Sequence, residues 1–344
     1  APIVVAKELE LDFKHGFKLE IAKDSSWMSV RDKLICGDLD AAHCLWSLPM
    51  SVAAGVSGPT DATLPVALTM AANGQGITLS GEHFPIPYGD LKAFGRAVDL
   101  LRAKRGAPLQ FASTFPGGTH DVWLRETLRR AGVAPSDYEV QTIPPPQMIL
   151  SLQSGQIDGF CAGEPWNGLA ASKGAGWTFL ASQDLWPDHP EKALVCSPQF
   201  VEERPEMLRA LMKAVLEACL WLDDPRNLER TAQKLARPEY VGASQDAILS
   251  RLTGHYELGA HAGTRVYDEH KLAFSKGGQI NAPRAEWAQW FFEFFAGNGH
   301  ELPENFDIEA RAQSLCLEEL YHEIALELIG DGVEISLPEE ILVG

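Results

Sequence analysis

Apolar runs alternate with helical patterns along the first part of the chain, up to about Ser197. Short runs rich in apolar and β-branched residues indicate buried strands, whereas apolar residues three and four positions apart indicate helices. The alternation predicts an α/β fold in which parallel or mixed sheets are covered by helices. The predicted strands are Lys18–Lys23, Ala41–Leu45, Val66–Ala71, Gly76–Ser80, Gln110–Ser113, Glu139–Ile143, Gly159–Ala162, Trp177–Ala181 and Ala193–Ser197.

Capping residues, glycines and prolines mark where helices begin and end. The helices predicted from them are Trp27–Ile35 after Ser26, Asp121–Arg130 after Thr119, Gln147–Ser154 after Pro146 and Glu206–Leu222 after Pro205. Beyond Ser197 strands largely disappear. The helical patterns there run over Pro205–Arg237, Ser244–Thr253, Arg284–Gly297 and Ala310–Leu328.

The change of pattern at Ser197 predicts two lobes. A chain of 344 residues exceeds the roughly 100–200 residues of a typical single domain. We expect lobe I to combine residues 1–84 with residues 195–344, because the helical C-terminal region needs a sheet to pack on. Lobe II is then an inserted α/β domain of residues 85–194, entered through a linker at Phe84–Gly89.

Composition excludes several classes of protein. Hydrophobic residues at 45% and charged residues at 22% are typical of a globular protein, and no apolar stretch approaches the ~20 residues of a transmembrane helix. The net charge of -18 and the lack of a basic run argue against nucleic-acid binding. An anionic ligand would therefore need local donors that are shielded from the acidic surface.

The six cysteines are scattered, without a CxxC pair and without a histidine at zinc-ligand spacing. We expect buried thiols, no metal site and no cofactor. Six thiols favour a reducing compartment. No signal peptide is visible before Ala1, so localisation cannot be read from the N-terminus.

Two glycine-containing loops have features of binding sites. Asn73-Gly74-Gln75-Gly76 is typical of a hairpin turn, although a Gln between glycines also leaves an amide that a ligand can approach. Phe115-Pro116-Gly117-Gly118-Thr119-His120 leads from a strand into a helix N-terminus, where N–H groups and the helix dipole favour an anion. His120 is either a ligand or an ordinary first-turn residue. The loop lacks the spacing and the lysine of a nucleotide-binding loop.

A third loop, Gly163-Glu164-Pro165-Trp166-Asn167, also follows a strand and opens a helix. Pro165 at the first helical position is sufficient to explain the proline, but Trp166 has no structural explanation. Lys192 precedes a strand and is either a surface lysine or a point charge for an anion. Hydrolase and metalloprotease motifs do not occur, and Asp223-Asp224 marks a helix end, so we expect no enzymatic activity.

Taken in order, these motifs resemble the nitrate/bicarbonate-binding proteins of ABC transporters, which have the two-lobed type II periplasmic-binding-protein fold (venus flytrap). Relatives of this family include cytoplasmic nitrate sensors that control a protein partner. The resemblance extends to about Ala296. It is carried by Trp27 with Arg31-Asp32-Lys33, Leu39-Asp40-Ala41-Ala42-His43, Asn73-Gly74-Gln75-Gly76-Ile77-Thr78, Gly155-Gln156-Ile157-Asp158-Gly159-Phe160, Gly163-Glu164-Pro165-Trp166-Asn167 and Trp186-Pro187-Asp188-His189-Pro190-Glu191-Lys192.

The resemblance implies a set of ligand-binding residues in the cleft between the lobes. Nitrate-binding members use a Trp, a Gln, a His, a backbone Gly and a Lys, which match Trp27, Gln75, His120, Gly163 and Lys192 here. Nitrate is planar and singly charged, so a ring, N–H donors and one lysine suit it. Bicarbonate has a proton to donate, and members that bind it use an acidic acceptor and calcium. His120 and Lys192 therefore favour nitrate or nitrite.

The resemblance predicts a solute-binding protein that closes its lobes over the anion and delivers it to an ABC permease, in the periplasm or anchored outside the inner membrane. The predicted hinge lies near Phe84–Pro87 and Ala193–Pro198. The alternatives are a cytoplasmic nitrate or nitrite sensor with a regulatory protein partner, a bicarbonate-binding homologue, and an enzyme on the same fold. Residues 297–344, with Glu318, Glu319, Glu323 and Glu327, resemble nothing in the family and are a candidate partner-binding appendage.

Overall fold

The computed structural model describes residues 1–24, 26–59, 62–259 and 262–337. Contacts divide the chain into two compact units. Unit 1 consists of Ala1–Ala72, Pro190–Gly242 and Ala273–Gly344, and unit 2 of Asn73–His189 and Ala243–Leu272. No helix in the described part of the chain is both long enough and apolar enough to cross a membrane.

A three-stranded sheet lies at the centre of unit 1. Its order is β1 (Ala41–Leu45), β8 (Pro190–Cys196), β2 (Val66–Ala72), and both outer strands are antiparallel to β8. The helices of this unit are α1 (Pro2–Glu8), α2 (Leu11–Lys14), α3 (Trp27–Cys36), α4 (Leu48–Ala53), α9 (Pro198–Glu203), α10 (Pro205–Asp223), α11 (Leu228–Leu235), α13 (Ala285–Gly297), α14 (Ile308–Leu315) and α15 (Glu318–Gly330), with a 3-10 turn η3 (Pro225–Asn227).

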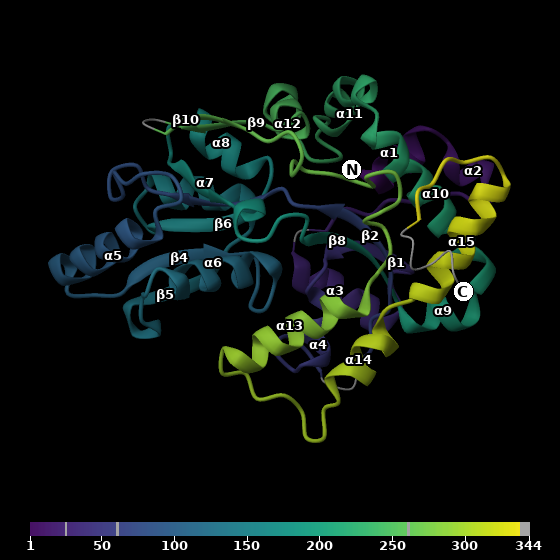
Figure 1. Ribbon diagram of the computed structural model, residues 1–344, viewed down its shortest axis with the longest axis horizontal. Helices are drawn as coiled ribbons and strands as arrows, with labels where there is room; N and C mark the ends of the chain where they lie inside the picture. The colour runs from purple at the N-terminus through teal and green to yellow at the C-terminus, as the bar shows by residue number, and fades with distance from the viewer. Residues whose placement is uncertain (25, 60–61, 260–261, 338–344) are drawn as a thin grey trace. The chain divides into compact units, whose positions relative to one another are not determined.

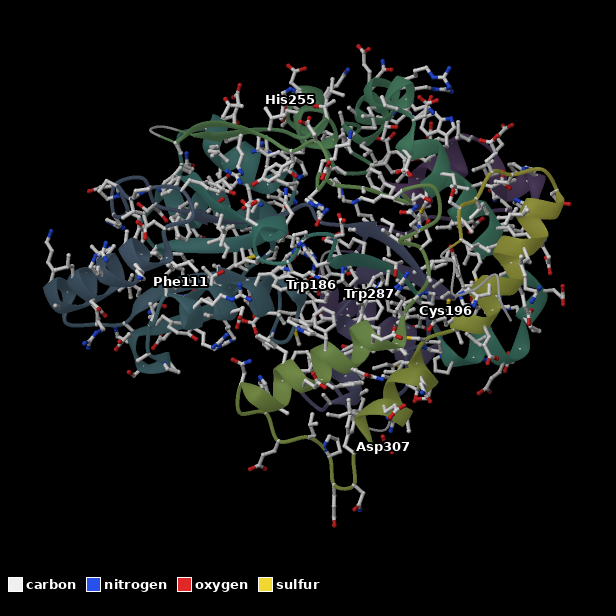
Figure 2. All side chains as sticks on the ribbon, viewed as in Figure 1. Phe111, Trp186, Cys196, His255, Trp287 and Asp307 are labelled. Carbon is white, nitrogen blue, oxygen red and sulfur yellow. The ribbon has the colours of Figure 1, made fainter. Side chains whose placement is uncertain are left out.

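Helix α10 is the central helix of unit 1. Leu208, Leu211, Met212 and Val215 are buried at the three- and four-residue spacing of one helix face. The helix packs against α1, α2, β2 and α15. Trp287 on α13, labelled in Figure 2, meets the ring of Trp46 edge-on, with centroids 5.7 Å apart. N-terminal, middle and C-terminal segments of the sequence therefore share one core.

The C-terminal segment is part of this core, as far as the structure describes it. Tyr321, Ile324 and Leu328 of α15 are buried, and Tyr321 donates a hydrogen bond to the carbonyl of Gly278 at 2.9 Å. Glu323 pairs with Arg209 of α10 at 2.8 Å. The interpretation of residues 297–344 as an appendage is thus wrong for α14 and α15, because their apolar faces complete unit 1. Residues 338–344 lie outside the described residues.

Unit 2 contains a five-stranded mixed sheet with the order β5–β4–β6–β3–β7. β4 is parallel to β5 and β6, whereas β3 is antiparallel to β6 and β7. The strands are β3 (Gln75–Leu79), β4 (Leu109–Ser113), β5 (Tyr138–Thr142), β6 (Gly159–Gly163) and β7 (Trp177–Ala181). The other elements are α5 (Leu91–Arg105), α6 (Thr119–Arg130), η1 (Pro135–Asp137), α7 (Pro145–Gln153), α8 (Trp166–Ser172), η2 (Ser182–Asp184), α12 (Gln245–Leu252), β9 (His255–Gly259) and β10 (Gly263–Val266). The predicted α/β class is confirmed in both units.

Helices cover the sheet of unit 2 (Figure 1), where α7 and α8 lie beside β6 and α6 lies beside β4 and β6. Asp90 caps α5 through the amide of Ala93, and Gly106 ends the helix with φ of 67°. Trp166, which sequence reasoning left unexplained, packs against the cluster of Met148, Leu152 and Phe160. Its large ring fills the space between α7 and β6.

Two predicted elements are wrong and one hairpin was missed. Lys18–Lys23 is not a strand; within it, the amide of Leu19 donates to the carboxylate of Asp12 at 2.7 Å and not to a neighbouring strand. The hairpin β9–β10 was missed, although Tyr256 and Leu258 are buried between exposed His255 and Glu257 in an alternating pattern. Asn73-Gly74 is not a hairpin turn, since β2 and β3 belong to different sheets.

The unit boundaries differ from the lobe boundaries expected from the sequence, residues 84/85 and 194/195. Pairing of β3 with β6 and β7 places the chain after Ala72 in unit 2, and Ala243–Leu272 also belongs to unit 2. Phe84 is fully buried and its ring lies 5.5 Å from that of Phe94. The expected linker at Phe84–Gly89 is therefore part of unit 2. The backbone passes between the units at Ala72/Asn73, His189/Pro190, Gly242/Ala243 and Leu272/Ala273.

Candidate functional site

Gln75 and Gly163 are brought together by the pairing of β3 with β6 in unit 2, where they are direct cross-strand partners. The amide of Glu164 donates to the carbonyl of Gly74 at 2.8 Å, so Gly74 and Glu164 occupy a hydrogen-bonded position. Because such positions alternate in an antiparallel ladder, Gln75 and Gly163 form a non-hydrogen-bonded pair. The Gly163 amide consequently points away from β3, toward the edge of β6 that faces β4.

The N-terminus of α6 meets Gln75. The Gln75 side chain is fully buried, and its Nε2 donates to Thr119 Oγ1 at 2.9 Å. Thr119 is the first residue of the helix, whose cap is Gly118, so the predicted capping role of Thr119 is wrong. Its hydroxyl contacts Gln75 instead. The amide nitrogen of Gln75 carries two hydrogens, of which this contact uses one.

His120 is the next residue of α6 and is 2% exposed. Its Nδ1 lies 2.8 Å from Thr114 Oγ1, which belongs to the loop after β4. The loop is tight because Gly117 adopts φ of 76°, and a Cβ on Gly118 would lie 2.8 Å from the ring of Phe115. His120 is therefore held in the first turn of a helix, where the dipole favours a bound anion.

Asp121 fixes the same helix end. Its carboxylate accepts from the amide of Gly117 at 3.1 Å and from Arg125 Nε at 2.9 Å. The carboxylate thus links the loop before α6 to an arginine one turn further along the helix. A negative charge at this position also suits the helix dipole.

A second series of contacts holds the backbone of Gln75. The Gln75 backbone amide donates to Ser182 Oγ at 3.2 Å, and Ser182 Oγ lies 2.7 Å from Nε2 of the fully buried His189. The His189 ring packs against Trp123 and Trp186, with centroids 4.7 Å and 6.4 Å away; Trp186 is labelled in Figure 2. These contacts hold the start of β3 in place.

An ion pair that is almost fully buried supports the Gly163 loop. Glu164 and Arg251 have side chains that are 1% and 2% exposed and lie 3.1 Å apart. Arg251 also donates to the carbonyls of His255 and Glu257 and lies 4.4 Å over the ring of Tyr256. This pair attaches α12 and β9 to the loop of Gly163. Pro165 is the cap residue before α8, not its first helical residue as predicted.

The other two predicted ligands lie in unit 1. Lys192 sits on β8, the central strand, opposite Leu45 on β1 and Ala71 on β2. Its side chain is 13% exposed and forms an ion pair with Glu191. The Lys192 ammonium lies 5.9 Å from the ring centroid of Trp27, the first residue of α3, which Ser26 caps through the amide of Ser29. Lys192 is therefore no ordinary surface lysine.

The predicted ligands thus form two sets. We call Gln75, His120 and Gly163 the donor set; all three belong to unit 2. We call Trp27 and Lys192, with the ion-pair partner Glu191, the charge set; all three belong to unit 1. The donor set presents N–H groups suited to an acceptor without protons of its own, and the charge set presents one ammonium group beside an aromatic face.

Sequence reasoning missed the residues that hold these sets. These residues are polar and buried, and none is more than 6% exposed: Thr114, Ser182, Arg251 and Glu191. Only Glu191 had a visible signal, because it stands beside Lys192 in the sequence. Ser182 and Arg251 contact Gln75 and Glu164, which are distant in the sequence, whereas Thr114 contacts His120 only six residues away.

The described residues contain no candidate metal site, and their cysteines show no sign of a reactive thiol. No group of three or more His, Cys, Asp or Glu side chains in residues 1–24, 26–59, 62–259 and 262–337 is placed to hold a metal ion. All six cysteines are free thiols. Burial raises the pKa of Cys44, Cys196, Cys219 and Cys316, so these thiols stay protonated at neutral pH.

Comparison with known proteins gives consistent matches. The model of the NMT1-like family matches residues 1–236. The nitrate/nitrite binding protein NrtA of Synechococcus elongatus is 34% identical over 335 residues, covering 94% of this chain and 74% of that protein. The crystal structure of the periplasmic nitrate-binding protein NrtA from Synechocystis aligns with a TM-score of 0.89 and 30% identity, covering 97% of this chain and 88% of the other.

A third match is to part of a longer protein. The bicarbonate transport ATP-binding protein CmpC of Synechococcus elongatus is 33% identical over 250 residues, covering 72% of this chain and 37% of that protein. The match to the Synechocystis structure confirms the predicted periplasmic-binding-protein fold. The alignments with the two NrtA proteins cover 94% and 97% of this chain. The uncovered residues are fewer than those after Ala296, so the resemblance extends into the C-terminal helices.

Proposed function

Because this chain belongs to the NMT1-like family, we propose that it is the solute-binding protein of an ABC importer and that its ligand is nitrate or nitrite. The observation that carries the proposal is the donor set, in which Gln75 and Gly163 are cross-strand partners and Gln75 contacts the residue before His120. The named relatives support the choice of ligand, since two of them are called nitrate-binding proteins.

The chemistry of the donor set favours an acceptor anion. Nitrate accepts hydrogen bonds and donates none, and its charge is spread over three oxygens. Hydrogen bonds to a charged group are worth roughly 1.5–3 kcal/mol each. An amide, an imidazole and a backbone N–H at a helix N-terminus and a strand end can supply such bonds without adding a second buried charge.

We propose further that the charge set contributes to binding the same anion. Lys192 then supplies the compensating charge, and the ring of Trp27 lies beside it. Lys192 also forms an ion pair with Glu191, whose carboxylate reduces but does not remove the positive charge that the anion meets. Closure of two lobes over the anion remains a prediction from the resemblance. A smaller radius of gyration in X-ray scattering after adding nitrate would support it.

We propose a binding role and no catalysis, with an ABC permease and its ATPase as partners. The periplasm, or a membrane anchor facing it, is the proposed location, as in the Synechocystis relative, which is named periplasmic. A cytoplasmic sensor with a regulatory partner stays the alternative, because six free thiols suit a reducing compartment. Cell fractionation separates the two: recovery with the cytoplasm would exclude the importer.

Isothermal titration with nitrate, nitrite, bicarbonate and sulfate tests the ligand. We expect heat and 1:1 binding with nitrate or nitrite and weaker binding of bicarbonate, because the hydroxyl of bicarbonate needs an acceptor. The backbone N–H of Gly163 cannot accept, and Gln75 accepts only through its amide oxygen. The absence of heat with both nitrogen oxyanions would overturn the proposal. Binding of bicarbonate alone would favour the bicarbonate-binding homologue.

A further inference from the structure

We propose that Thr114 is a specificity-determining residue, which acts by fixing the hydrogen of the His120 imidazole on Nε2. The inference rests on the proposed function, since it concerns which hydrogen-bonding groups the donor set offers to an anion. Thr114 lies in the loop after β4 and does not belong to the predicted ligand set. Its contact with His120 Nδ1, at 2.8 Å, is the observation from which the argument starts.

The N-terminus of α6 favours a neutral imidazole over an imidazolium ion at His120. His120 is the second residue of α6, and the first turn of a helix carries a partial positive charge that opposes an imidazolium ion. The neighbouring carboxylate of Asp121 is engaged by Arg125 and by the amide of Gly117. A neutral imidazole has one N–H, so only one of its two nitrogens can donate.

The direction of the hydrogen bond follows from the burial of Thr114. This residue is 6% exposed, and among the described residues His120 Nδ1 is the hydrogen-bond partner of its hydroxyl. If Nδ1 carried the hydrogen and donated it, the hydroxyl hydrogen of Thr114 would be buried without an acceptor. If the hydroxyl donates to Nδ1, one hydrogen bond satisfies both groups. Leaving a buried donor unsatisfied costs ~1–3 kcal/mol, so the second arrangement is favoured.

The hydrogen of His120 is then on Nε2, and His120 can only donate through that nitrogen. The donor set therefore offers hydrogens from Gln75, Gly163 and His120 and no imidazole lone pair. An anion without hydrogens gains from every one of these groups. Bicarbonate, whose hydroxyl needs an acceptor, does not find one at His120. Thr114 in this way selects against protonated anions without touching the ligand.

The tautomer is read directly by nitrogen NMR of protein labelled with 15N at its ten histidines, in the absence of any anion. A His120→Gln variant assigns the resonances. We expect the wild-type protein to carry the hydrogen on Nε2, and the Thr114→Ser variant to keep it there because it retains the hydroxyl. The Thr114→Val variant should lose the shift of Nδ1 that a donated hydrogen bond causes. Hydrogen on Nδ1 in the wild-type protein would overturn the proposal.

Titrations of the same variants measure specificity. We expect Thr114→Val to weaken nitrate binding roughly three- to tenfold, the net value of one neutral hydrogen bond, and to weaken bicarbonate binding less. Thr114→Ser should restore the wild-type ratio. Thr127 is a fully buried threonine of α6, the helix of His120, and Thr127→Val is the matched control. It should change neither the His120 tautomer nor the ratio of nitrate to bicarbonate affinity. An unchanged ratio in Thr114→Val would contradict the selection.

The two proposals fail separately. If titration of the wild-type protein with nitrate and nitrite gives no heat, the proposed function is overturned. The NMR measurement without ligand still shows whether Thr114 fixes the tautomer of His120. With nitrate bound normally but hydrogen on Nδ1, the proposed function stands and the role of Thr114 is wrong. Melting temperatures of the threonine variants show whether a loss of affinity reflects a loss of fold.

Discussion

The donor set and the charge set have opposite designs. In the donor set each group is neutral and has its own support: Thr119 contacts Gln75, Thr114 contacts His120, and the ladder between Gly74 and Glu164 orients Gly163. In the charge set a single cation, Lys192, is already paired with Glu191. We infer from this difference that the hydrogen bonds of the proposed site select the anion, whereas its charge set sets how strongly a chain of net charge -18 binds it.

The design also predicts how mutations combine. Groups with separate supports contribute nearly independently, so substitutions of two supporting residues, Thr114 behind His120 and Ser182 behind Gln75, should act almost additively on affinity. The two ions of the charge set share one interaction. Removing one of them exposes the other, and their effects must therefore be strongly non-additive.

The largest effect is expected for Lys192→Ala. The variant loses the cation and leaves the carboxylate of Glu191, which is 3% exposed, to repel the anion. Removing a protein charge that pairs with a bound charged group costs roughly 2–5 kcal/mol of binding free energy, so we expect nitrate affinity to fall roughly a hundredfold or more. Isothermal titration measures it. The double variant Glu191→Gln with Lys192→Ala is the control and should recover part of the loss; an equally weak double variant would show that Glu191 has no electrostatic role.

The next largest effect is expected for His120→Ala. One hydrogen bond to a charged group is lost, which corresponds to roughly 1.5–3 kcal/mol or about a ten- to hundredfold rise in Kd. No buried charge is exposed, but the buried hydroxyl of Thr114 loses its acceptor, so we expect a lower melting temperature without ligand and a retained fold. His255, an exposed histidine on β9, supplies the control His255→Ala with unchanged affinity. Loss of the fold in His120→Ala would mean that the ring holds α6 in place instead of binding.

The sequence predicted the donor loops because their signals are local. Gly117 and Gly118 form a tight turn before a helix, and this is visible as a glycine pair after a strand. Most predicted strands of both units are also found, since buried strands are continuous apolar runs, as in Val66–Ala72. The match of the five ligand residues came from the resemblance and not from the patterns.

The remainder depends on contacts between distant segments. Nothing near Arg251 in the sequence indicates that it pairs with Glu164, and the alternation of buried residues in the short strand from His255 to Gly259 was overlooked among helices. Asn73-Gly74 has the composition of a hairpin turn, and only the sheet order shows that it connects two units. Glutamates of α15 seemed free for a partner because their cations, Arg209 and Lys213, are distant in sequence.

A smaller effect is expected for Trp27→Phe, which keeps an aromatic face near Lys192 but reduces its electron density. Cation–π contacts at partly exposed sites contribute roughly 0.5–1 kcal/mol, and only part of this is lost, so we expect nitrate affinity to fall about two- to fourfold. Nitrate titrations of Trp27→Phe and Trp27→Leu separate the contribution of the aromatic ring from that of side-chain volume. If both variants bind like the wild-type protein, Trp27 does not belong to the charge set.

The smallest effect is expected outside both sets, at the ion pairs of α15 with α10. Hydrogen bonds from Lys213 and Arg209 lower the pKa of Glu327. A carboxyl group with a lowered pKa stabilises the folded state above its ordinary value of 4.5, and this contribution is lost as the pH falls through the lowered pKa. The group is largely exposed, so Glu327→Gln should cost ~0.2–1 kcal/mol of unfolding free energy.

Urea unfolding of Glu327→Gln and of the wild-type protein at a series of pH values checks this expectation. The difference should be present at neutral pH and shrink below pH 4.5, while nitrate affinity stays unchanged at neutral pH. Glu323→Gln, which removes one of the two α15 carboxylates paired with Arg209, is the matched variant for nitrate affinity and should also leave it unchanged. A change in nitrate affinity in either variant would couple α15 to binding, and the assignment of binding to the donor set and the charge set alone would then fail.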